Sequence, residues 1–193
     1  MQKIIWFFFL TWSLSAFSQT EEQREMDSLR LAFIENYREL FSLHPIHHVG
    51  WVTDYEQLYS KSEKAMLNSL IDQYEKETTV EIVIVTIDST RVSADRFEEL
   101  SLTIANHWGV GKFGKDNGVL IAISKDYRKI RIQNGNGIEK ILTNEETSEI
   151  INSVFIPAFR NGNYFEGTMQ GVKELIKFLN KNGAKDTFSY SSV

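Results

Sequence analysis

The sequence contains no cysteine and carries no excess of positive charge. The absence of cysteine excludes disulfides, thiolate zinc sites and cysteine nucleophiles, including those of the cysteine-based phosphatases. Any metal ion must therefore be held by oxygen or imidazole. The net charge is −5 and the pI is near 5.5, with no basic stripe interleaved with aromatic residues. We therefore expect no nucleic-acid partner.

Long apolar runs are absent beyond the N-terminus. There, Lys3 precedes an apolar segment from Ile4 to Leu14, and Ala16-Phe17-Ser18 has the small-x-small pattern of a cleavage site. This pattern predicts a signal peptide at residues 1–18 and a secreted or periplasmic mature chain. An uncleaved membrane anchor is the alternative, but the run is shorter than the roughly 20 residues of a span and contains polar residues. We therefore expect no transmembrane segment in the mature chain.

The remaining chain is predicted to form one globular domain with extensions at both ends. Its length of 193 residues and its hydrophobic content of 42% suit one core. Residues 19–49 are expected to form an amphipathic helix and a linker, and the apolar stripe within 21–43 packs on its own domain or on another subunit. His44, His47 and His48 in this linker invite a metal interpretation, but an exposed linker is favoured. Residues 50–182 form the domain, and 183–193 a flexible tail.

The hydrophobic pattern predicts an α/β fold. Ser60 and Glu63 form a capping box that opens a helix to about Lys76, and the apolar run 80–87 suits a strand covered on both faces. A helix capped by Ser93 and a strand at 119–124 complete a β-α-β unit. Residues 129–134 then pair antiparallel with that strand. Two further helices follow, one opened by the capping box of Thr143 and Glu146 and ended or kinked near Pro157, the other buried along one face from Phe165 to Leu179.

A glycine-rich loop at 109–118 connects the second helix to the second strand. In a hairpin, the loop entering the first strand and the loop leaving the second lie at one end, so Asp116 and Asn117 are predicted to lie near Asn136 and Glu139. Carboxylate and amide oxygens are ligands that Ca²⁺ and Mg²⁺ prefer. The alternatives are that Asp116-Asn117-Gly118 is simply a turn that starts a strand, and that Glu139 pairs with a nearby lysine.

Several linked motifs in the same order resemble the TPM domain, a family named for a thylakoid lumen protein, a photosystem II accessory protein and a nematode receptor modulator. The motifs are Val52-Thr53-Asp54-Tyr55, Trp108-Gly109-Val110-Gly111, Gly114-Lys115-Asp116-Asn117-Gly118-Val119-Leu120, Arg128-Lys129-Ile130-Arg131-Ile132, Gly135-Asn136-Gly137-Ile138-Glu139, Leu142-Thr143 and Ile156-Pro157-Ala158-Phe159-Arg160-Asn161-Gly162-Asn163-Tyr164-Phe165-Glu166-Gly167. The resemblance covers about residues 50–180. It implies an α/β/α three-layer sandwich with a central, mixed and mostly parallel sheet, about four flanking helices and a shallow cleft formed by the motif loops.

The resemblance also implies divalent-metal binding, and acid phosphatase activity in plant members. Carried over to this sequence, the predicted metal ligands are Asp54, Asp116, Asn117 and Glu139. Asp54 is the least certain from topology, because the helix after it can place it at the opposite end of the sheet. Asp88 and Asp126, expected at that opposite end, form the fallback cluster.

Two classes of function remain open. The first is a noncatalytic module that binds Ca²⁺ or Mg²⁺ in the cell envelope, in protein maintenance or in binding a protein partner. The alternative is a metal-assisted acid phosphatase. The sequence favours the first, because it offers no phosphate-cradling loop leading into a helix and no histidine nucleophile with an obvious partner. Lys115 and Arg128 are candidates for binding an anion, and are equally well explained as solvated surface charges.

Overall fold

A computed structural model of the chain describes residues 21, 23–29, 31 and 46–188. The predicted signal peptide, most of the linker with His44, and residues 189–193 lie outside this range. The described domain runs in the order β1 (Val52–Asp54), α2 (Lys61–Thr78), β2 (Glu81–Thr86), α3 (Phe97–Trp108), β3 (Gly118–Ser124), β4 (Lys129–Asn134), α4 (Asn144–Ile150), the π-helix η1 (Ile151–Phe155), α5 (Ile156–Arg160), α6 (Tyr164–Lys181) and α7 (Ala184–Phe188).

The four strands form one mixed sheet in the order β1-β2-β3-β4. β1 pairs parallel with β2, β2 pairs parallel with β3, and β3 pairs antiparallel with β4. The predicted β-α-β unit and hairpin are confirmed. β1 lies parallel to β2 with Asp54 opposite Thr86, so Asp54 stands at the carboxyl end of the parallel strands.

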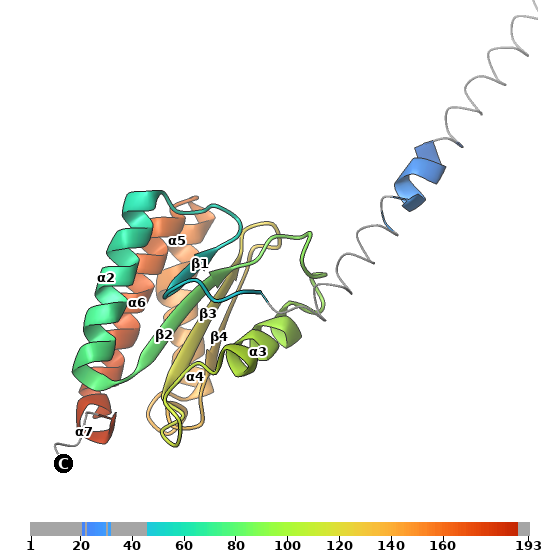
Figure 1. The fold of residues 1–193 in the computed structure, drawn as a ribbon. Coiled ribbons are helices and arrows are strands. Elements are labelled where there is room, and N and C mark those ends of the chain that lie inside the picture. The colour runs from blue at the N-terminus through green and yellow to red at the C-terminus, as the bar shows by residue number, and fades with distance from the viewer. Residues whose placement is uncertain (1–20, 22, 30, 32–45, 189–193) are drawn as a thin grey trace, which may run out of the picture.

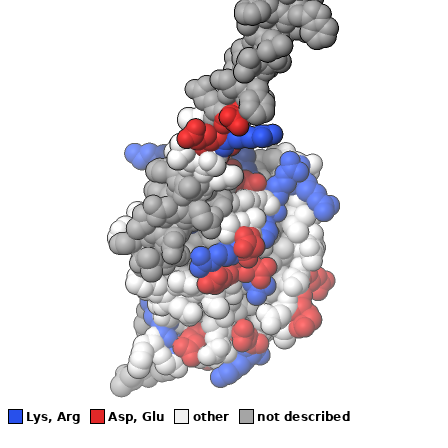
Figure 2. Space-filling model, turned by 90° about the vertical axis from the view of Figure 1, so that its right-hand side faces the viewer, with Lys and Arg blue, Asp and Glu red and all other residues white. Residues whose placement is uncertain are grey.

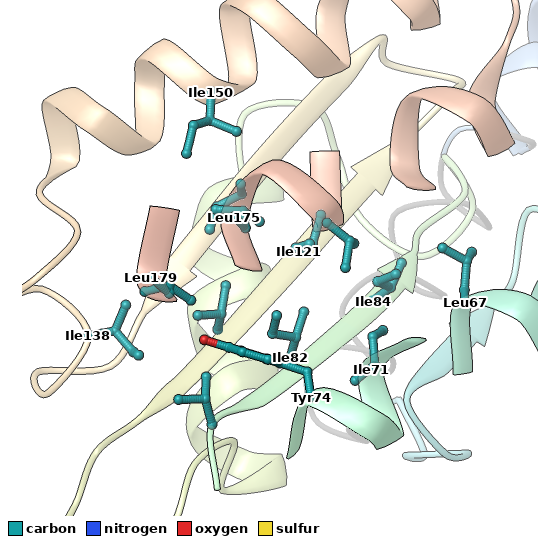
Figure 3. Packing of buried hydrophobic residues seen from close by; sticks show 14 of the residues in the cluster. Leu67, Ile71, Tyr74, Ile82, Ile84, Ile121, Ile138, Ile150, Leu175 and Leu179 are labelled. Atoms are coloured by element: carbon teal, nitrogen blue, oxygen red, sulfur yellow. The ribbon is translucent and has the colours of Figure 1, made fainter. Parts of the chain in front are cut away.

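Helices cover both faces of the sheet, so the predicted α/β/α sandwich is confirmed (Figure 1). Alternate residues of β2 and β3 belong to two separate hydrophobic clusters. One cluster contains Ile82, Ile84 and Ile121 and is covered by α2, α4 and α6, as Figure 3 shows from close by. The other contains Val83, Val85 and Leu120 and is covered by α3. Burial on both faces explains why these strands have near-continuous apolar sequences.

Local capping signals mark two helix starts as predicted. The Ser60 hydroxyl accepts a hydrogen bond from the Glu63 N–H at 3.3 Å, and the Glu63 carboxylate accepts one from the Ser60 N–H at 2.7 Å. The same reciprocal pair joins Thr143 and Glu146. Ser93, by contrast, is not a cap: its carbonyl accepts from the Arg96 N–H within a turn, and α3 begins at Phe97.

The chain remains helical through Pro157. Proline has no N–H to donate, and the preceding turn widens so that the Ile156 N–H donates to the Ile151 carbonyl, five residues back. The π-helix η1 therefore carries the chain from α4 into α5. Phe155, at the end of this turn, is fully buried against Gly171, and an added Cβ on Gly171 would lie 2.0 Å from its ring.

The C-terminal segment is partly ordered, contrary to the predicted tail at 183–193. Ala184–Phe188 form α7, and Phe188 is buried. The Phe188 carbonyl accepts hydrogen bonds from the Thr79 hydroxyl at 2.6 Å and from Lys115 Nζ at 2.7 Å. These contacts involve side chains that are distant in sequence, which explains why composition alone suggested a free end.

The described residues between 21 and 31 are helical, as predicted, and all of them are exposed. After the linker, Ile46 is buried against the α3 face, where its carbonyl accepts a hydrogen bond from Trp108 Nε1. Within the described residues no helix is long and apolar enough to cross a membrane. On the face shown in Figure 2, acidic side chains gather near the centre, with basic side chains next to them.

Candidate functional site

The predicted site residues lie at two opposite ends of the sheet. Asp116 and Asn117 directly precede β3 and Glu139 follows β4, so all three lie at the amino end of β3. The loops that enter β3 and leave β4 are at the bottom of Figure 1. Asp54 lies at the carboxyl end of β1, next to Thr86. The six residues of β2 separate the two ends, which corresponds to about 17 Å at the usual rise per residue. One metal site cannot include all four residues.

At the amino end, the two motif loops meet as predicted, through their backbones. The Gly135 N–H donates to the Gly118 carbonyl at 2.8 Å, and the Gly137 N–H donates to the Asp116 carbonyl at 3.0 Å. The approach is so close that a Cβ on Gly137 would lie 2.1 Å from the Lys115 carbonyl oxygen. Gly118, Gly135 and Gly137 are therefore required for backbone packing.

Asn117 has a structural role at this end. Its side chain is buried, its Oδ1 accepts from the Lys112 N–H at 2.8 Å, and its Nδ2 donates to the Thr79 carbonyl at 2.9 Å. The amide oxygen thus holds the glycine loop in shape. Asp116 and Glu139 differ from it, because both are exposed and their carboxylates face solvent.

The lysines of the glycine loop are engaged in the fold. Lys112 Nζ lies 2.7 Å from carboxylate oxygens of both Glu75 and Glu81, and these bonds raise the pKa of Lys112. Lys115 Nζ donates to the Phe188 carbonyl and to the Thr79 hydroxyl. The loop therefore leaves neither ammonium group directed at a ligand site.

At the opposite end, Asp54 is also structural. Its side chain has no exposed area, and its two oxygens accept hydrogen bonds from the N–H groups of Leu58 and Tyr59, each at 3.0 Å, and from the Thr86 hydroxyl at 2.7 Å. Lys64 Nζ lies 3.9 Å away. Asp54 thus fixes the loop between β1 and α2 onto β2.

The fallback residues Asp88 and Asp126 do lie at this carboxyl end, in adjacent loops. Asp88 accepts hydrogen bonds from the Thr90 N–H at 3.1 Å and from Arg91 Nε at 2.8 Å. Asp126 accepts from the Ser89 N–H at 2.8 Å and from the Ser89 hydroxyl at 2.6 Å, and these bonds lower the pKa of Asp126. Across the part of the chain that the structure describes, no group of three or more His, Asp or Glu side chains is arranged to hold a metal ion.

Sequence reasoning missed Glu56, which supports the turn between β3 and β4. Its carboxylate accepts hydrogen bonds from the Lys125 N–H at 2.8 Å, the Asp126 N–H at 3.1 Å and the Ser124 hydroxyl at 3.4 Å. Burial raises the pKa of Glu56 despite these bonds. The only sequence signal was an acidic residue two positions after Asp54, at the end of a strand.

A cavity of about 750 Å³ opens beside this turn, between β4, α5 and the start of α6. Its lining residues are Ser124, Lys125, Asp126, Arg128, Lys129, Ile130, Ile156, Phe159, Arg160, Gly162 and Tyr164. A cavity of this size is within the range that holds small-molecule ligands. It also lies outside the carboxyl ends of the parallel strands, where open α/β sheets commonly bind ligands.

Cationic side chains surround this cavity. Lys125, Arg128 and Arg160 are exposed, and no hydrogen bond or ion pair within the described residues involves the side chains of Arg128 or Arg160. Lys129 differs, because its Nζ donates to the Ala94 carbonyl. Arg128 adopts a φ of 52°, and its N–H donates to the Lys125 carbonyl at 3.1 Å, which closes the turn that carries both residues. We call the cavity with these three cations the basic cleft.

The sequence contained a signal for part of the basic cleft. Phe159, Arg160 and Tyr164 all belong to the last of the family motifs, but the hydrophobic pattern places them only between a helix that ends or kinks near Pro157 and the last helix. Only the π-helical turn before α5 and the turn at Gly162, where φ is 79°, bring them to the side of β4. The cleft combines anion-binding groups with an apolar wall, which suits an organic anion.

Comparisons with known proteins agree with this architecture. The N-terminal domain of a protein from P. gingivalis is 30% identical, with a TM-score of 0.64, over 73% of this chain and 87% of that chain. The BA42 protein from Bizionia argentinensis is 19% identical, with a TM-score of 0.58, over 72% of this chain and 89% of that chain. The N-terminal domain of the cg2496 protein from Corynebacterium glutamicum is 18% identical, with a TM-score of 0.53, over 77% of this chain and 88% of that chain.

No curated protein matches the chain significantly. The family model of the TPM domain matches residues 52–178, which is more than half of the sequence and includes both the glycine-rich motifs and the basic cleft. The order of motifs, the sheet topology and this match lead to one conclusion. The chain belongs to the TPM domain family.

Proposed function

We propose that this TPM domain binds phosphate esters in the basic cleft and hydrolyses them as a metal-assisted acid phosphatase outside the cytoplasm. The observation that carries the proposal is the convergence of Lys125, Arg128 and Arg160 on one cavity. Guanidinium groups bind phosphate oxygens through pairs of N–H donors, and a lysine adds a point charge. Export rests on the signal peptide predicted at residues 1–18.

Asp126 is the carboxylate of the basic cleft that suits a cation or a reacting phosphoryl group. Both hydrogen bonds from Ser89 go to Oδ2, and they lower the pKa of the Asp126 carboxyl. Mg²⁺ commonly binds through one or two carboxylates together with substrate phosphate oxygens, so a cage of three acidic side chains is not required. A divalent ion bound there would neutralise phosphate charge.

Glu56 acts as a positioning residue in this proposal. Its carboxylate binds the N–H groups of Lys125 and Asp126, so it holds the turn that carries the cations of the basic cleft. The turn is therefore ordered before a ligand arrives, which lowers the entropic cost of binding.

The test is a titration of the protein with inorganic phosphate, followed by amide chemical shifts. We expect shifts concentrated at residues 124–130 and 156–164, and a roughly tenfold weaker affinity in Arg160→Gln, because a charge-assisted hydrogen bond is lost. Arg96→Gln is the matched control, since Arg96 pairs with Glu99 on α3, across the sheet. Shifts outside the cleft, or equal loss in both variants, would contradict the proposal. Phosphate release from phenyl phosphate with Mg²⁺ or with EDTA then tests hydrolysis.

The second candidate is the noncatalytic Ca²⁺ or Mg²⁺ module, with an envelope protein as partner. The observation that favours it is that the Gly137 N–H binds the Asp116 carbonyl, which joins two loops that carry the exposed carboxylates of Asp116 and Glu139. Two carboxylates with backbone carbonyls and water suit a weak site for a hard cation. Asp54 and Asn117, which were also predicted as ligands, are not part of this site, because their side chains are buried and hydrogen-bonded within the fold.

A calcium titration distinguishes the two candidates. If the module is correct, shifts concentrate at residues 114–118 and 135–139, and the double variant Asp116→Asn with Glu139→Gln removes binding in the millimolar range. Because both side chains are exposed, the variant should unfold at the same denaturant concentration as the parent. Binding that survives this variant, or that depends on phosphate and shifts residues 124–130, rules out the amino-end site.

A further inference from the structure

The basic cleft has a second feature that phosphate alone does not explain, an aromatic wall. The rings of Phe159 and Tyr164 lie with centroids 4.9 Å apart and planes at 31°, and both line the cavity. Each is partly exposed, so ring surface is available to a ligand. Ile130 and Ile156 extend this apolar surface.

The wall is held in place before any ligand binds. Phe159 and Tyr164 flank a tight turn in which the Gly162 N–H donates to the Phe159 carbonyl at 3.0 Å and the Asn163 N–H donates to the Ala158 carbonyl at 3.1 Å. Behind the wall, the fully buried Phe155 packs edge-on against Phe159 with centroids 5.9 Å apart. Rigid aromatic surfaces of this kind bind planar groups at low entropic cost.

The cations stand directly beside the aromatic wall. Arg160 follows Phe159 in α5, and Arg128 is near enough to Tyr164 for its charge to influence the phenol. Burial is the larger influence and raises the pKa of Tyr164, so its hydroxyl remains a hydrogen-bond donor at neutral pH. An anionic group and a planar apolar group of one small ligand therefore meet complementary surfaces side by side.

We propose that the ligand of the basic cleft is a phosphate monoester of an aromatic alcohol, with the phosphate against Arg128 and Arg160 and the ring against Phe159 and Tyr164. This inference rests on the proposed function and names its substrate class. A phosphate attached directly to a ring matches cations that directly adjoin the wall. Nucleotides place a hydroxyl-bearing sugar between phosphate and ring, and sugar phosphates have such a sugar in place of the ring. Asp126 is the one carboxylate among the lining residues that could accept hydrogen bonds from these hydroxyl groups, so the cleft suits them less well.

The test compares benzylphosphonate with ethylphosphonate, two ligands that resist hydrolysis and differ in the ring. We expect benzylphosphonate to bind about tenfold more tightly, in line with the usual strength of aromatic contacts. In Tyr164→Leu that preference should fall to about twofold, and amide chemical shifts at residues 124–130 on addition of ethylphosphonate should persist, which shows that the cleft is intact. Phe113→Leu is the matched control, because Phe113 is a fully exposed aromatic residue at the opposite end of the sheet, and it should change neither affinity.

The outcomes separate the two proposals. Equal affinity for the two phosphonates, or tighter binding of adenosine monophosphate than of benzylphosphonate, overturns the aryl assignment and leaves phosphate binding standing. Binding of neither phosphonate, with no response to inorganic phosphate, overturns both. A peptide that contains phosphonomethylphenylalanine, a stable analogue of phosphotyrosine, tests whether the aryl phosphate belongs to a protein or to a small molecule. Tighter binding of the peptide than of benzylphosphonate supports the assignment with protein phosphotyrosine as the source, and equal binding supports it with a small aryl phosphate.

Discussion

Replacing Gly118 with alanine is expected to lower the free energy of unfolding by about 3 kcal/mol or more, as severe overpacking does. Gly118 opens β3, and an added Cβ would lie 2.0 Å from the Val110 carbonyl oxygen. The obstacle is backbone, so no side-chain rotation relieves it. Moving residues 110–111 away would also disturb the bond from the Gly111 N–H to Glu81, which is 2.7 Å long.

Gly114→Ala in the same loop separates close packing from backbone conformation. Gly114 has a φ of 73° but no heavy atom within 4 Å of an added Cβ, so its substitution should cost only about 1 kcal/mol, the usual penalty of a left-handed residue. Urea unfolding of the parent and both variants measures the difference. Equal losses in the two variants would mean that conformation alone, and not close packing, requires glycine at this loop.

At the amino end of β3, the sequence predicted the shape of the glycine loop and its contact with a second loop. Four glycines in a short stretch indicated a shaped loop, and hairpin topology indicated which second loop would meet it. Both predictions depend on neighbours in sequence. The burial of Asn117 was not predictable in this way, because its partner, the carbonyl of Thr79, comes from 38 residues earlier in the chain and from the far side of a crossover.

At the carboxyl end of the parallel strands, contacts between residues distant in sequence were again not predictable. The predicted capping boxes at Ser60 and Thr143 are confirmed, and they were predictable because each forms within one helical turn. The basic cleft instead combines the β3–β4 turn with α5 and α6, and α5 reaches it only through the π-helical turn before Pro157. Sequence periodicity carries no signal for a single widened turn. Arg160 and Tyr164 were therefore recognised as family motif residues without being recognised as neighbours of Arg128.

Asp54 is where the structure and the sequence-based expectation differ most, and its substitution separates a structural acid from a metal ligand. Asp54→Ala should lower the free energy of unfolding by about 3 kcal/mol, because it leaves buried donors without an acceptor. Those donors are the N–H groups of Leu58 and Tyr59 and the hydroxyl of Thr86, which all bind the Asp54 carboxylate. Urea unfolding measures the loss, and Asp54→Asn, which retains one acceptor oxygen, should lose less than Asp54→Ala.

The matched controls are Asp116→Asn and Glu139→Gln, whose exposed side chains should each change stability by less than about 0.5 kcal/mol. A calcium titration of the same variants completes the comparison. If Asp54→Ala keeps the stability of the parent and loses calcium binding, Asp54 is the metal ligand that the family resemblance implied. If stability falls and the calcium titration of Asp54→Ala gives the same result as that of the parent, Asp54 serves the fold. The second outcome follows from the geometry, because a carboxylate whose oxygens already accept three hydrogen bonds in a fully buried position has to give up those bonds before it can bind a cation.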